Sequence, residues 1–461
     1  MNPNQLVILV FILVYFGFIL YTRRKGDFEE YAVAGRSLGV FLIFASFCAT
    51  SIGPASTLGF SRAGFTQGWF IAYFAGFAGL TTLFTAFFIA PKIRANFPDS
   101  KSMGDIVGGP NSHHHPAIQL GVGLVGLGMM SAVTIAMAYA GGELVNNVFG
   151  FSKTISITIM TIIVIIYASL GGIRATIQTD AFQFVVFIIL IPVLAILITQ
   201  NSSFSWSKYV EHTTKITEYT YDQQTVSDLF SSFFYFTFGY LHLSPDYIGR
   251  FMSARTPTVA KTAGILAAIF LALWIILMAF IGSTGAFLLP NLEESDQLLL
   301  NIAESQLPSI LYSIFFIAML GVVMSTMDST INSASIAFSE DIVGQLKPEI
   351  TDKEKLKYAK IFTLLLGVAA IIIATFLTSI LAVIKSLFAF YTPIMIPVAF
   401  FAILKSTHYW QAGIASMISG FLYFIFWQLI GAPFLPPEVV ATLLSVLTYW
   451  VVDRWFTYAK A

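Results

Sequence analysis

The 461-residue chain is poor in both cysteine and charge. Cys48 is its single cysteine, which excludes a disulfide within the chain and any metal cluster built from cysteines. Charged residues make up 10% of the sequence and their formal net charge is zero, so bulk charge indicates neither a nucleic acid nor an acidic partner. The sequence also lacks a Walker motif and a nucleophile paired with a base, so we expect neither an ATP-driven pump nor an enzyme.

Long apolar runs dominate the sequence instead. Hydrophobic residues account for 57% of the chain, and its mean hydropathy is +0.81. A run of about 18 apolar residues or more can cross roughly 30 Å of hydrocarbon. We therefore predict an all-α polytopic membrane protein of the plasma or inner cell membrane, with the lipid bilayer as its partner. About thirteen spans are predicted: 6–22, 41–63, 67–91, 117–148, 154–170, 178–199, 227–245, 260–289, 309–340, 358–377, 379–404, 409–430 and 437–456.

Positive charges are distributed unevenly between the predicted loops. With the N-terminus outside and the C-terminus in the cytoplasm, the cytoplasmic loops would hold most lysines and arginines, Arg250 among them. The outside loops would hold only Arg62, Lys153, Lys208 and Lys215. This asymmetry favours that orientation, because cytoplasmic loops carry the excess of positive charge. The first span, 6–22, has its charges after the apolar run, as in a retained helix, and the longest loop, 200–226, is expected to be a surface connection outside.

The predicted span 309–340 is apolar in its first half and rich in oxygen-bearing side chains in its second. Four residues of the second half share one helical face: Val322, Ser325, Thr326 and Ser329. Asp328 lies on the flank of that face, and a carboxylate within a membrane normally faces a partner or a wet cavity. Since hard cations prefer oxygen ligands, we interpret this face as one wall of a cation site in a transporter. The alternative is that these hydroxyls only bond their own helix or join neighbouring helices.

Spans two to six and seven to eleven can be superimposed as two groups of five with opposite orientation. The first span of each group contains turn-forming residues, Gly53-Pro54 in one group, and Gly239 with Ser244-Pro245 in the other. Paired broken helices at matching positions indicate the binding site in inverted-repeat transporters. Because Pro54 has no N–H, carbonyls near residues 49–53 are freed and would supply the second wall of the cation site. A kink that merely shapes the helix is the alternative.

Several strings in the sequence resemble those of one family. Residues 167–183 read YASLGGIRATIQTDAFQ, and the strings GRSLG at 35–39, RFMSAR at 250–255 and MSTMDSTINSAS at 324–335 follow in order around it. Together they resemble the sodium:solute symporter family over nearly the whole chain. The resemblance implies a leucine-transporter-like core of two inverted five-helix repeats and sodium-coupled uptake of a small solute by alternating access. It divides a single transporter domain (1–461) into an extra N-terminal helix (6–22), a first repeat (41–199), a second repeat (227–430) and an extra C-terminal helix (437–456).

The resemblance also implies where sodium (Na+) binds. In this family one sodium is held by two carbonyls of the first core helix, and by a carbonyl and two hydroxyls of the eighth. The matching positions are Ala49, Ile52, Val322, Ser325 and Thr326. Some members bind a further sodium, and the positions that match this possible additional site are Asp180, Ser325, Asp328 and Ser329. Asp180 could instead tune or relay the first ion.

The solute is expected beside the breaks, between the first and sixth core helices. The positions that match solute contacts in the family are Ser51, Ser56, Thr237 and Tyr240, although each hydroxyl could instead serve helix packing. Ser51 stands where a sugar carrier has an amide, and the Gln or Asn that precedes the RFMSAR-type string in sugar carriers is missing. The resemblance therefore favours a small organic anion or an amino acid over a sugar.

Two other functions stay open at this stage. A proton-coupled symporter would use Asp180 and Asp328 in place of a sodium site. A solute sensor would keep the transporter fold and signal occupancy to a partner, although the tail after 437–456 is too short for the signalling domain that some relatives carry. No obligatory protein partner is inferred for the leading hypothesis, sodium-coupled symport.

Overall fold

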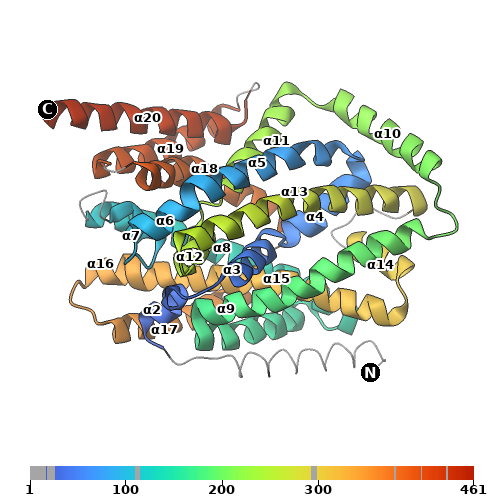
Figure 1. The fold of residues 1–461 in the computed structure, drawn as a ribbon, viewed down its shortest axis with the longest axis horizontal. Helices are drawn as coiled ribbons and strands as arrows, with labels where there is room; N and C mark the ends of the chain where they lie inside the picture. Colours follow the sequence, from blue (N-terminus) through green and yellow to red (C-terminus); the bar gives the residue numbers. More distant parts are fainter. Residues whose placement is uncertain are drawn as a thin grey trace.

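The computed structural model describes residues 26–109, 115–291, 298–377, 380–405, 408–431 and 435–460, together with Gly17. These residues form helices and connecting turns, and one isolated bridge joins Leu38 to Ala254. Long helices lie side by side along the molecule, and the last two helices lie together at one edge (Figure 1). The predicted all-α fold is therefore confirmed.

From Gly26 onward, the described residues in the first half of the chain form twelve named helical elements. The last of them lies in the connection 200–226, which the sequence predicted to be outside. In order they are α2 (Phe28–Val33), η1 (Ala34–Arg36), α3 (Val40–Ser51), α4 (Pro54–Gln67), η2 (Phe70–Phe74), α5 (Ala75–Phe84), η3 (Thr85–Ile89), α6 (Ala90–Asn96), α7 (Met103–Gly108), α8 (Pro116–Phe149), α9 (Lys153–Thr199) and α10 (Trp206–Gln223). The connection 200–226 is thus mostly helical, because α10 occupies most of it.

The second half repeats the alternation of long and broken helices. Its elements are α11 (Val226–Phe238), η5 (Gly239–Leu241), α12 (Pro245–Ser253), α13 (Pro257–Leu288), α14 (Leu298–Gln306), α15 (Ser309–Ile336), η6 (Ala337–Val343), α16 (Gly344–Leu346), α17 (Asp352–Ala374), α18 (Ile380–Leu404), α19 (Trp410–Ile430) and α20 (Pro437–Lys460). The stretch Ser309–Leu346 is 38 residues long and α8 is 34, so the predicted spans 309–340 and 117–148 both lie in long helices.

Nine stretches of the described helices are long and apolar enough to cross a membrane, and the bent pair α3 and α4 makes a tenth. The predicted spans 154–170 and 178–199 lie in two segments of α9, Lys153–Ser169 and Gly171–Thr199, which a kink at Gly172 separates. Gly172 has φ +58°, and a Cβ there would lie 2.7 Å from the carbonyl oxygen of Tyr31, so only glycine suits this position. The predicted span 6–22 lies outside the described residues apart from Gly17, and the exact count of thirteen is not confirmed.

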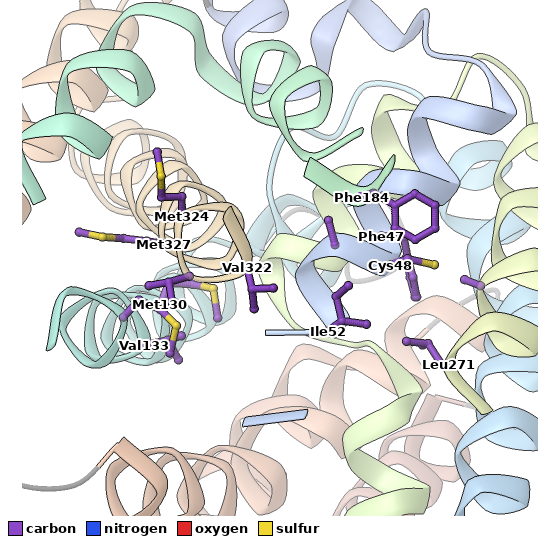
Figure 2. Packing of buried hydrophobic residues seen from close by; sticks show 14 of the residues in the cluster. Phe47, Cys48, Ile52, Met130, Val133, Phe184, Leu271, Val322, Met324 and Met327 are labelled. Atoms are coloured by element: carbon purple, nitrogen blue, oxygen red, sulfur yellow. The ribbon is translucent and has the colours of Figure 1, made fainter. Parts of the chain in front are cut away.

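Helix α3 contacts α9, α13 and α15, which surround it in the bundle (Figure 1). Phe47 and Cys48 of α3 are buried among apolar side chains of these neighbours, as expected for packing residues. Figure 2 shows Ile52, which follows α3, and Val322 of α15 close to each other, with Met130 and Val133 of α8 next to α15. The two segments that the sequence proposed as walls of a cation site therefore lie side by side.

Candidate functional site

Helix α3 and helix α4 form one broken span. Helix α3 ends at Ser51 and α4 begins at Pro54, and their axes differ by 51°. The Oγ of Ser56 donates to the Ser51 carbonyl at 2.6 Å, and the Oγ1 of Thr57 donates to the Ile52 carbonyl at 2.5 Å. The predicted interruption at Gly53-Pro54 is thus present, and side chains of α4 supply donors to the Ser51 and Ile52 carbonyls, which the break leaves without a helical N–H.

The polar face of α15 packs directly against this break. The Oγ of Ser325 donates to the Ala49 carbonyl at 3.2 Å and lies 3.1 Å from the Val322 carbonyl, which Thr326 Oγ1 also approaches, at 3.2 Å. A Cβ on Gly53 would lie 2.8 Å from Thr326 Oγ1, so the backbone at Gly53 packs directly against the Thr326 side chain of α15.

These contacts bring together four of the five residues that the resemblance assigned to the first sodium. Oxygens of Ala49, Val322, Ser325 and Thr326 converge, and the Ile52 carbonyl belongs to the same break, where Thr57 occupies one of its two acceptor positions. Uncharged carbonyl and hydroxyl oxygens are the donor set that a hard monovalent cation takes, so the residues present fit sodium.

A second polar cluster lies one turn further along α15. Arg250 of α12 is 1% exposed, and its Nη2 lies 2.9 Å from the Oδ2 of the fully buried Asp180. The same guanidinium donates to Ser46 Oγ at 2.8 Å, to Ser329 Oγ at 2.6 Å and to Thr50 Oγ1. The placement of Arg250 in a cytoplasmic loop was therefore wrong. Its charge is buried because Asp180 and three hydroxyls surround it.

Three of the four residues of the possible additional sodium site contact one another on α15, and Arg250 connects Asp180 to Ser329. The Oγ of Ser329 donates to the Ser325 carbonyl at 2.6 Å and lies 3.2 Å from Asp328 Oδ1. However, the guanidinium of Arg250 lies against Asp180 and Ser329, so a protein cation stands where the resemblance placed a second ion. Sequence reasoning missed this arginine, and the only signal for it was the RFMSAR string that contributed to the resemblance.

A cavity of about 120 Å³ opens beside both breaks. Ser51, Ser56 and Tyr240 line it, whereas Thr237, the fourth predicted solute residue, is not among its lining residues. The cavity is also lined by residues that the sequence did not single out for the solute: Asp246, Tyr247, Tyr235, Phe388 and Thr326. Because Thr326 belongs to both groups, the candidate ion site and the cavity share a side chain.

The second break places two further polar residues, His242 and Ser244, in the cavity wall. Helix α11 ends at Phe238, and His242 adopts the left-handed conformation (φ 51°, ψ 42°) before α12 begins at Pro245. A non-glycine residue in this conformation is held there by its surroundings. The ring of His242 lies 4.5 Å from those of Phe47 and Tyr247, centroid to centroid.

A broken-helix bundle with an oxygen-lined ion site beside a small solute cavity is the architecture of a secondary transporter. The model of the sodium:solute symporter family matches residues 31–420. Sodium/proline symporter 2 of Staphylococcus saprophyticus is 24% identical over 92% of this chain and 85% of that protein, and the sodium/proline symporter of Staphylococcus aureus is 23% identical over 97% and 90%.

Solved structures show the same fold. A sodium-coupled sialic acid symporter, in a substrate-bound outward-open state, superimposes with a TM-score of 0.86 and 17% identity, covering 99% of this chain and 98% of that one. A nucleobase-cation-symport-1 family transporter superimposes with a TM-score of 0.64 and 13% identity, over 93% and 95%.

The chain belongs to the sodium:solute symporter family. It is an integral membrane transporter with the leucine-transporter-like fold, and it couples sodium to the symport of a small organic solute. This outcome supports the leading hypothesis over the proton-coupled symporter and the solute sensor.

Proposed function

We propose that sodium binds between the α3–α4 break and α15, held by Ala49, Ile52, Val322, Ser325 and Thr326, and that the solute binds in the adjoining cavity. The contact between Ser325 Oγ and the Ala49 carbonyl carries the proposal, because it joins the two walls. Thr326 faces both the ion ligands and the cavity, which gives ion and solute a shared side chain.

Coupling follows from this arrangement. An ion between α3 and α15 holds the two helices together. It therefore favours the conformation of the transporter in which the ligand oxygens of α3 and α15 lie close to each other. That shift in population is limited by the difference in sodium affinity between the two states. The state that binds sodium better then presents Ser51 and Ser56 to the solute.

The residues of the possible additional sodium site serve a different purpose in this proposal. Arg250 neutralises Asp180 and contacts Ser329. The guanidinium of Arg250 therefore supplies the positive charge at this position in this conformation, in place of a second sodium ion. One sodium bound at the first site is then sufficient for coupling.

Several broader features belong to the same proposal. The first repeat comprises residues 41–199 and the second 227–430, flanked by the extra helices 6–22 and 437–456. The N-terminus lies outside and the C-terminus in the cytoplasm of a plasma or inner membrane. The transporter acts without an obligatory protein partner. The solute is an amino acid or a small organic anion, and the sodium/proline symporters among the relatives put amino acids first.

The test compares sodium dependence in single-hydroxyl variants. In proteoliposomes, Ser325→Ala and Thr326→Ala should each raise the sodium concentration for half-maximal uptake roughly tenfold, the effect of about 1.4 kcal/mol. The solute used is whichever amino acid or organic anion raises the melting temperature of the purified protein in sodium.

Ser313→Ala is the matched control, since the buried Ser313 hydroxyl donates to the Ser309 carbonyl of the same helix, α15. It should leave the sodium dependence unchanged. If all three variants keep the sodium dependence of the unmodified protein, the proposed ion site is wrong.

A further inference from the structure

We propose that Asp246 recognises a positively charged nitrogen on the solute, with His242 Nδ1 as a second acceptor for its N–H groups. The solute would then carry an ammonium group. This inference rests on the proposed function, because it takes the cavity beside the two breaks as the solute site. It narrows the solute class from organic anions and amino acids to compounds that bear an amine.

The charges around the cavity are the first support. Asp246 is the single ionisable carboxylate among the described side chains that line it, and no described lysine or arginine lines it. Asp246 is 5% exposed, and within the described chain it has no ion-pair partner. A buried carboxylate without a cation is costly, so a cationic ligand would stabilise this wall of the cavity.

The nearby Arg250 does not neutralise Asp246. Its Nη1 donates to the backbone carbonyl of Asp246 at 2.8 Å, and its ion pair is with Asp180. The Oδ1 of Asp246 accepts a hydrogen bond from the hydroxyl of Ser244, which is uncharged. A carboxylate has room for about four hydrogen bonds, so Asp246 keeps acceptor capacity for a ligand.

His242 adds an acceptor on the same wall. Thr82 Oγ1 lies 2.8 Å from the Ala78 carbonyl and 3.0 Å from His242 Nε2, and both contacts are satisfied when Thr82 donates to the carbonyl and Nε2 donates to Thr82. This assigns the neutral tautomer whose Nδ1 is an unprotonated acceptor. Nδ1 is buried and has no hydrogen-bond partner within the described chain, so a solute N–H would satisfy it.

The other side chains of the cavity fit an ammonium group as well. The Ser51 hydroxyl donates to the Phe47 carbonyl, the Ser56 hydroxyl to the Ser51 carbonyl, and Thr330 to Thr326, so their free lone pairs act as acceptors. The aromatic rings that line the cavity attract a cation through their faces: Tyr235, Tyr240, Tyr247 and Phe388. Tyrosine hydroxyls can donate to a carboxylate on the same solute, but they are uncharged and do not offset a second negative charge beside Asp246.

Matched sets of compounds test the inference. The probes are the standard amino acids, their deaminated carboxylic acids and their decarboxylated amines, measured as shifts in the melting temperature of the purified full-length protein with and without sodium. We expect one or more amine-bearing probes to stabilise the protein in a sodium-dependent manner, and the deaminated counterpart to bind roughly 10- to 100-fold more weakly, the range for a charge-assisted hydrogen bond.

Two variants test whether Asp246 is the residue that binds the amine. Asp246→Asn keeps the size of the side chain and an acceptor for Ser244 but removes the charge, and it should weaken binding of the amine-bearing probe by the same factor. Glu211→Gln removes an exposed carboxylate on α10 and should leave binding unchanged. The comparison of probes on the unmodified protein decides the question even if Asp246→Asn does not fold.

The outcomes separate this inference from the proposed function. Equal binding of a carboxylic acid and its amino acid, stabilisation by sugars alone, no shift with any amine-bearing probe, or unchanged amine binding in Asp246→Asn would each overturn the inference. Sodium-dependent stabilisation by a solute without an amine would leave the proposed function standing. Stabilisation that does not depend on sodium, or that survives Ser325→Ala unchanged, would instead contradict the ion site.

Discussion

Arg250 is a single residue whose burial decides how charge is balanced in the middle of the molecule. It joins α12 to Asp180 of α9 and to hydroxyls of α3 and α15, so four helices meet at one guanidinium. Charges at this depth are costly unless they are paired and hydrogen-bonded. The pair therefore connects the helix after the second break to α3 and α15, which carry the proposed ion site.

Removing either partner alone should be more harmful than removing both. Arg250→Gln leaves Asp180 buried without a cation and should cost about 3–5 kcal/mol of stability. Adding Asp180→Asn to it should recover much of that loss, because no uncompensated charge remains. The measurement is the melting temperature of the purified variants.

Arg454→Gln on the exposed side of α20 provides the comparison for removing an arginine. It should leave the melting temperature within the scatter of the unmodified protein. A double variant no more stable than Arg250→Gln alone would show that charge compensation is not what Arg250 supplies.

The sequence predicts the hydroxyl face of α15 but not the buried position of Arg250. The hydroxyls of Ser325, Thr326 and Ser329 follow the period of a helix, so their common face can be inferred locally. Arg250 lies in a charged and polar stretch that looks like a loop, and its partner Asp180 is distant in the sequence. Such a pairing depends on tertiary packing, which local periodicity does not report.

Among the elements, the break between α3 and α4 is the feature on which the proposed ion site depends. A Cβ on Gly53 would lie 2.8 Å from Thr326 Oγ1, and Thr326 is held by its contact with the Val322 carbonyl. The absence of a side chain at Gly53 therefore lets the break approach α15 closely enough for oxygens of both helices to converge.

Gly53→Ala should push Thr326 away from the break and raise the sodium concentration for half-maximal uptake by about tenfold, comparable with loss of the Thr326 hydroxyl. Gly59→Ala is the matched control, because a Cβ at Gly59 of the same helix α4 would meet no atom within 4 Å. Uptake measured over a range of sodium concentrations distinguishes them. A Gly53→Ala protein with unchanged sodium dependence would mean that this close approach does not position Thr326.

The elements themselves were predictable where hydrophobicity and turn chemistry act together. Gly53-Pro54 and Ser244-Pro245 mark breaks that are present, because proline and glycine act through local backbone geometry. The two spans predicted at 154–170 and 178–199 match the two segments of α9 that the kink at Gly172 separates, and the sequence placed Arg174 in a loop between them. There Arg174 is largely buried through its bonds to Glu30 and the Ala34 carbonyl, which the sequence does not reveal.

For the whole molecule, we propose that one sodium ion joins the α3–α4 break to α15. This contact couples binding of the ion to binding of the solute. The two helices come from opposite halves of the chain, 276 residues apart at the contact between Ala49 and Ser325. A small ion can bias a molecule of this size only if its site exists in one arrangement of the two halves and not in the other.

Equilibrium binding of radiolabelled sodium to the purified protein tests this claim most directly. The unmodified protein should show saturable binding, and the double variant Ser325→Ala/Thr326→Ala should show binding weakened by tenfold or more, while Ser313→Ala binds as the unmodified protein does. Equal sodium binding by the double variant and the unmodified protein would contradict the account.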